Sequence, residues 1–126
     1  MIILTADEVT ELHKKLIMAT GGSYGLRDIE LLESAVMGCN QTFGGEDLHP
    51  SVVEKAARMA FSICMNHPFV DGNKRVAVTA LLVILRLNSV PVSYTQQELI
   101  ALGLGIAEGR IDYDGIVVWI HTHIKK

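Results

Sequence analysis

The chain has 126 residues, of which 49% are hydrophobic and 20% charged, and this balance predicts a globular domain and excludes a disordered segment. Its 14 acidic and 11 basic side chains give a net charge of −3. An acidic chain without a long basic run is not attracted to a phosphate backbone, so we expect no direct binding to nucleic acid.

Neither the start of the chain nor its most apolar stretch predicts contact with a membrane. Residues 1–5 lack the basic region and the long apolar run of a signal peptide. The apolar stretch at 76–87 is too short to span a bilayer and contains Arg86. We therefore expect a cytoplasmic protein that does not enter a membrane.

Six segments, taken in chain order, carry the signals that begin and end helices. Their expected first residues or caps are Thr5, Asp28, Ser51, Asn73, Thr95 and Asp112. Their expected ends are Gly21, Gly38, residue 66 or 67, Asn88, Gly109 and the C-terminal region. Only residues 90–94 alternate in polarity over a short stretch. The pattern predicts an all-α fold, a compact bundle of about six helices in a single domain that spans 1–126.

The third and fourth helices are expected to form the centre of the bundle because they are apolar on nearly every face. Between them stands the sequence HPFVDGNKR, residues 67–75, which is called the motif below. Pro68 predicts that His67 adopts extended backbone and that the third helix ends there. Phe69 is expected to point toward the core and anchor the connection.

The polar residues of the motif suit a phosphate. The start of a helix presents free N–H groups and a positive dipole end, and Gly72 lets the backbone approach a ligand closely. Cations at Lys74 and Arg75 oppose the dipole of the helix, so they make sense if an anion lies among them. Asn73 adds an amide donor and Arg75 can donate two N–H bonds.

Two further residues suit the chemistry of a nucleotide. Asp71 would repel phosphate by itself, but a carboxylate that holds Mg²⁺ bridged to phosphates removes that conflict. His67 is the group of the motif that titrates near neutral pH, and it could take a proton from an attacking hydroxyl.

Each of these residues also has a purely structural interpretation. His67 and Asn73 could cap helices, Asp71 could be a turn residue, and Lys74 and Arg75 could be solvated surface. All five together between two buried helices favour a site that handles phosphate.

The motif resembles the signature of the Fic/Doc family, H-P-F-x-[D/E]-G-N-[G/K]-R. The segment GGSYGLRDIELLESAV at 21–36 resembles the death-on-curing (Doc) branch, and the resemblance covers the whole chain. It implies a small helical bundle that transfers part of ATP, often AMP, to a hydroxyl of a target protein. By this pattern His67 is the general base and Asp71 the Mg²⁺ ligand, while Gly72, Asn73 and Arg75 hold the phosphates.

The residue at position 74 differs between the AMP-transferring members of this family and its Doc branch. AMP-transferring members usually carry glycine there, whereas the Doc branch carries lysine and phosphorylates elongation factor Tu. The resemblance thus implies a Mg²⁺- and ATP-dependent phosphotransferase toxin. Gly72 matches the AMP-transferring pattern, so an AMP-transferase remains an alternative, and a module that binds nucleotide or antitoxin without turnover is a third.

The resemblance also implies partners. Family members are often restrained by a helix with the pattern [S/T]-x-x-x-E-[G/N], which this sequence lacks, so we expect a separate antitoxin protein. A homo-oligomer is left open. The long connector from Cys39 to His49 contains Phe43, Gly44 and Gly45, and the resemblance implies a flap there that aligns a target peptide by strand addition; a plain flexible loop is the alternative.

Overall fold

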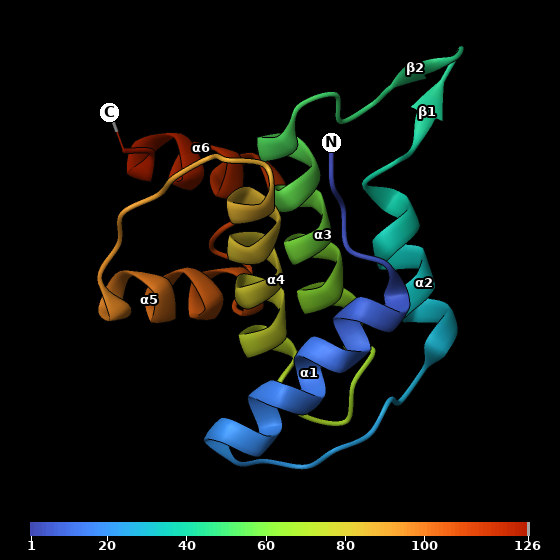
Figure 1. The fold of residues 1–126 in the computed structure, drawn as a ribbon, viewed down its shortest axis with the longest axis vertical. Coiled ribbons are helices and arrows are strands. Elements are labelled where there is room, and N and C mark those ends of the chain that lie inside the picture. Colours follow the sequence, from blue (N-terminus) through green and yellow to red (C-terminus); the bar gives the residue numbers. More distant parts are fainter. Residues whose placement is uncertain (126) are drawn as a thin grey trace.

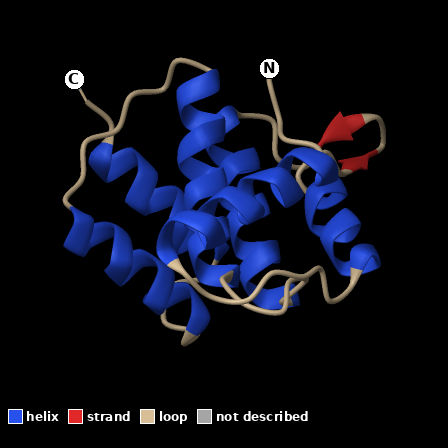
Figure 2. Cartoon of the chain, turned by 60° about the horizontal axis from the view of Figure 1, so that its bottom comes forward, coloured by secondary structure: helices blue, strands red, loops and turns tan. Residues whose placement is uncertain are grey.

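The computed structural model describes residues 1–125 and contains six helices and one small hairpin (Figure 1). The elements are α1 Ala6–Thr20, α2 Ile29–Gly38, β1 Thr42–Phe43, β2 Glu46–Asp47, α3 Val52–Asn66, α4 Asn73–Leu87, α5 Gln96–Ala107 and α6 Tyr113–His123. Figure 2 shows that helices make up almost all of the regular structure. The predicted all-α bundle is therefore confirmed, with a short flap between α2 and α3.

The helices begin where the sequence places cap residues. In five of the six helices within residues 1–125, a cap side chain accepts the backbone N–H of the third helical residue, and the caps are Thr5, Asp28, Ser51, Thr95 and Asp112. Such a cap satisfies a donor that the helix leaves unpaired. Only α4 begins without one, at Gly72. This exception lies inside the motif.

Helices α3 and α4 form the centre of the bundle, as their sequences predict. α3 packs against α2, α4, α5 and α6 (Figure 1). The helix faces that meet here are rich in small buried side chains, which allow close approach: Ala56, Ala57, Ala60, Ala77 and Ala80. No helix of residues 1–125 combines the length and the apolar character needed to cross a bilayer.

The hairpin is a two-residue turn between two very short strands. Thr42 pairs with Asp47 and Phe43 with Glu46. The turn residues Gly44 and Gly45 have φ angles of 60° and 84°, the left-handed values that hairpin turns require and that glycine adopts without strain. The hairpin stands out from the bundle (Figure 1).

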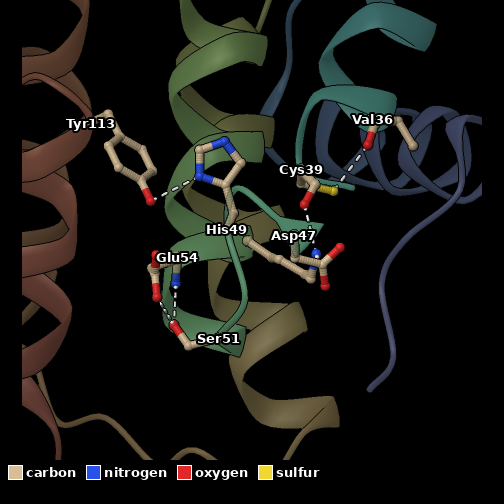
Figure 3. Close-up of polar contacts among 8 residues, drawn as sticks. Val36, Cys39, Asp47, His49, Ser51, Glu54 and Tyr113 are labelled. Atoms are coloured by element: carbon tan, nitrogen blue, oxygen red, sulfur yellow. Dashed lines mark hydrogen bonds and ion pairs between the residues drawn. The ribbon is translucent and has the colours of Figure 1, made fainter. Parts of the chain in front are cut away.

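Side chains at its base tie the hairpin to the helices (Figure 3). The Nζ of the buried Lys55 donates to the carbonyl of Cys39 over 2.8 Å and lies 3.6 Å from the Asp47 carboxylate. The ring of His49 is hydrogen-bonded to the Tyr113 hydroxyl over 3.0 Å. Polar contacts of Lys55 and His49 therefore connect the base of the hairpin to α2, α3 and α6.

His67 does not have the extended backbone that Pro68 predicts. Its φ of 50° and ψ of 55° are left-handed, and its N–H donates to Ile63 at the end of α3. Proline disfavours right-handed helix at the residue before it, and a left-handed residue is an alternative way to end a helix. The predicted end of α3 is confirmed, whereas the predicted conformation of His67 is wrong.

Candidate active site

The motif loop between α3 and α4 is held by the segment that joins α1 to α2. Figure 2 shows the two loops running together at one end of the bundle. The N–H groups of Arg27 and Asp28 both donate to the Pro68 carbonyl, over 2.7 and 3.0 Å, and the N–H of Val70 donates to Gly25 over 3.0 Å. The two loops thus form one backbone-paired layer that fixes the motif.

His67 is exposed and has an oriented ring. Its Nδ1 lies 3.1 Å from the Met65 carbonyl, which can only accept a hydrogen bond. A neutral ring in this contact carries its proton on Nδ1, so Nε2 has a free lone pair. The guanidinium of Arg27 donates to the carbonyls of His67 and Asn66, over 2.7 and 2.9 Å, and steadies the turn. This arrangement suits a general base.

Asp71 presents a carboxylate that is kept ionised. Oδ2 accepts the Ser23 N–H over 3.1 Å and Oδ1 accepts the Gly72 N–H over 2.8 Å. These bonds, the Ser23 bond first, lower the pKa of the carboxyl below its usual range, and the charge of Arg75 adds to the effect. A Cβ at Gly22 would lie only 2.7 Å from Oδ2, so glycine there leaves the carboxylate accessible.

The donor set fits magnesium. A carboxylate oxygen has two lone pairs, so Asp71 retains acceptor capacity after its two backbone bonds. Mg²⁺ in nucleotide sites is usually held by one or two carboxylates together with phosphate oxygens and water. A partly exposed, ionised aspartate beside a helix N-terminus satisfies that requirement.

The N-terminus of α4 is prepared for an anion. Within residues 1–125 the backbone N–H groups of residues 73–75 have no acceptor, and the cap residue Gly72, at φ 77°, offers no side chain. The first turn of α4 contains no acidic residue, whereas the first turn of each of the other five described helices has one. Lys74 is exposed at this end. Free donors and cations together attract phosphate.

Asn73 and Arg75 also hold the loop in place. The Asn73 amide accepts from the Phe69 N–H and donates to the Phe69 carbonyl, each over 3.0 Å. One nitrogen of Arg75 donates to the Thr20 hydroxyl and, over 2.9 Å, to the Gly21 carbonyl. Their binding of phosphate stays a prediction. It would use the backbone N–H of Asn73 and the donors of Arg75 that do not bond to residues 20 and 21.

His13 is a residue of this site that the sequence analysis missed. It is 2% exposed, its ring stacks on Phe69 at 3.9 Å, and its Nε2 donates to the Asp71 carbonyl over 2.7 Å. Phe69 is 1% exposed, which confirms its predicted place in the core. The signal was available: His13 lies between Val9 and Ile17 on the buried stripe of α1.

We expect His13→Leu to loosen the motif loop. The substitution keeps an apolar body under Phe69 but leaves the Asp71 carbonyl without its donor, at a cost of about 1–3 kcal/mol in the free energy of unfolding. His13→Gln retains an amide donor and should recover most of that loss. Chemical denaturation of both variants measures the difference, and equal stability would show that the hydrogen bond contributes nothing.

The hairpin is not part of this cluster. Phe43 is 81% exposed, and the hairpin meets the N-terminal end of α3, whereas the motif follows its C-terminal end (Figure 1). The 15 residues of α3 extend over about 22 Å. Phe43, Gly44 and Gly45 form the expected flap, and its part in aligning a target stays a prediction.

Comparison with known proteins agrees with the motif. Residues 3–85 match the Fic/DOC family, and the chain belongs to this family. It is 40% identical over 76 residues to "Toxin Doc" of Mycolicibacterium smegmatis, a match that covers 60% of this chain and only 58% of that relative. It is 30% identical over 113 residues to "Protein kinase doc" of Escherichia phage P1, covering 90% of this chain and 88% of that protein. The resemblance to the Doc branch is thereby confirmed.

Proposed function

We propose that this protein is the toxin of a toxin–antitoxin pair and a protein kinase that uses ATP and Mg²⁺. Its target would be a hydroxyl of a translation factor, elongation factor Tu, in the cytoplasm. The names of the two relatives support the toxin and the kinase. The observation that carries the proposal is the bare N-terminus of α4, with Lys74 and Arg75 in its first turn.

The residues of the motif divide the reaction between them. The free N–H groups of residues 73–75 and the cations bind and orient the phosphates of ATP. Nε2 of His67 takes the proton of the attacking hydroxyl as the new O–P bond forms and the bond between the γ-phosphorus and the leaving ADP breaks. Mg²⁺, which Asp71 would hold, supplies neutralisation of the phosphate charge. Arg27 and His13 keep His67 and Asp71 in position.

Lys74 favours transfer of the γ-phosphoryl group. Its Cβ lies beside α5, 3.9 Å from the position of a Cβ at Gly103, and the side chain is exposed in the first turn of α4. This volume and charge oppose the pose that presents the α-phosphate to the hydroxyl. Gly72, which the AMP-transferring pattern shares, favours AMP transfer as the second candidate.

We expect ATP labelled on the γ-phosphate to mark elongation factor Tu and ATP labelled on the α-phosphate to leave it unmarked. Lys74→Gly should reduce phosphoryl transfer by about tenfold, because it removes one cation from the transition-state charge. Intact-mass measurement of the target separates the two products. An adenylate adduct formed by the unmutated enzyme would favour the AMP-transferase.

The antitoxin would be a separate protein that restrains the enzyme. This part of the proposal rests on the names of the relatives and on the sequence, which lacks the restraining pattern of other family members. Co-expression with the product of an adjacent short gene tests it. Toxicity that persists at equal expression of both proteins would contradict it.

A further inference from the structure

A polar groove of about 800 Å³ runs between α2 and α3 and reaches Asn66, the last residue of α3 before the motif. One wall comes from α2 and includes Glu30, Glu33 and Met37. The other comes from successive turns of α3 and includes Arg58, Ser62 and Asn66. Neither the motif nor the fold explains why this groove is lined by charged side chains.

Arg58 is the residue in the groove that lacks a partner. Within residues 1–125 its buried Nε has no hydrogen-bond acceptor, and the guanidinium forms no ion pair. Its guanidinium carbon lies 5.7 Å from the centroid of the Phe61 ring, and its charge also acts on His49 and Tyr113. A buried donor without an acceptor is costly, and a guanidinium is shaped to take a carboxylate through two N–H bonds. The groove therefore presents a free site for one acidic group.

The charges follow a definite order along the groove. α2 and α3 run antiparallel, because Asn66 at the end of α3 donates to the Leu31 carbonyl near the start of α2, over 3.1 Å. At the other end, Arg58 lies beside Gly38, whose Cβ would be 4.0 Å from Nε. Glu33 thus lies between Arg58 and the end of α3, where His67 follows, and Glu30, one residue before Leu31, lies close to that end.

We infer that this groove binds an extended segment of the protein substrate, with an acidic side chain on Arg58 and a basic one toward Glu30 and Glu33. The inference rests on the proposed function, since it places the reacting hydroxyl at His67. The eight residue-to-residue steps from Arg58 to Asn66 rise about 12 Å along α3. An extended chain covers that distance in about four residues. The substrate should therefore carry its acidic residue about four residues from the hydroxyl, with the basic residue between them.

The test uses binding of fluorescein-labelled nonapeptides to the full chain without ATP, read by fluorescence polarisation. The first peptide carries threonine, then lysine, then glutamate about four residues from the threonine. In the second peptide the lysine and the glutamate are exchanged. Both peptides are also made with the sequence reversed, so that both chain directions are tested. In one chain direction we expect the first arrangement to bind about tenfold more tightly than the exchanged one, because a hydrogen-bonded charge pair accounts for such a factor.

The variants separate Arg58 from general charge effects. Arg58→Gln should abolish the preference and Arg58→Glu should reverse it. Arg110→Gln, a change at an exposed arginine that pairs with Glu108, should leave it intact. Circular dichroism confirms that each variant is folded. Equal binding of the two arrangements to the unmutated protein, or a preference that survives Arg58→Gln, would overturn the inference. Failure of labelled ATP to mark any protein would instead count against the proposed kinase, because the peptide measurement needs no catalysis.

Discussion

His67→Ala should lower the rate of transfer from ATP to the protein hydroxyl by about 10²–10⁴-fold, the usual contribution of a general base. The Met65 carbonyl holds the proton of the ring on Nδ1 and leaves Nε2 free to accept the substrate proton. The ring itself is exposed, so its removal creates no cavity. Single-turnover transfer to elongation factor Tu at saturating ATP measures the loss.

The left-handed backbone of His67 calls for a matched control. Alanine at a φ of 50° costs about 1–2 kcal/mol, which could be mistaken for a catalytic effect if it disturbs the loop. Asparagine tolerates this conformation better and also lacks a base, so His67→Asn separates the two. We expect both variants to be inactive and His67→Asn to melt nearer the unmutated protein. Full activity in either variant would remove His67 from the mechanism.

Local signals in the sequence were sufficient for most of the fold. Cap residues such as Thr5 and Thr95 act on N–H groups three residues away, so a short window of sequence contains both partners of the bond. At Thr5 and Thr95 the glutamate three residues on also accepts the N–H of the cap residue, but this second bond is missing at Ser51. Ser51 accepts the Glu54 N–H, but the Glu54 carboxylate bonds the serine hydroxyl and does not return to the Ser51 backbone (Figure 3).

The support of the site could not be predicted in the same way, because it depends on contacts between distant segments. Arg27 meets the end of α3 forty residues away in sequence, and His13 meets Asp71 across 58. The helical spacing of Val9, His13 and Ile17 indicates that His13 is buried, but nothing local indicates which distant segment His13 or Arg27 contacts. Arg75 illustrates the consequence: its charge suggests a phosphate ligand, yet part of its guanidinium holds the end of α1.

Contacts between distant segments also keep Asp71 ionised. A second large effect, on the binding of ATP with Mg²⁺, is therefore expected from removing its charge. Asp71→Asn keeps the size of the side chain but removes the charge that would hold Mg²⁺. We expect the unmutated protein to bind ATP with Mg²⁺ at least about 10²-fold more tightly than ATP in EDTA, and Asp71→Asn to lose most of that difference. Calorimetric titration under the two conditions measures it.

Arg75→Ala is the matched control, because a guanidinium acts on phosphate without the metal. It should weaken binding by a similar factor with and without Mg²⁺, whereas Asp71→Asn should affect only the binding that depends on Mg²⁺. Retention of the full Mg²⁺ effect in Asp71→Asn would place the metal elsewhere.

The pH dependence gives an independent check on Asp71 that requires neither metal nor ATP. Because the Ser23 and Gly72 N–H groups lower the pKa of the folded carboxyl, its stabilising effect is present above the ordinary aspartate value of about 3.9 and is lost as the pH falls through the lower folded value. Asp71→Asn should therefore melt below the unmutated protein at pH 7, and the two melting temperatures should converge in strong acid. If the difference in melting temperature stayed constant down to pH values well below 3.9, the two backbone bonds would not depend on the charge of Asp71. The Ser23 bond, which connects the motif to the segment between α1 and α2, would then not depend on that charge either.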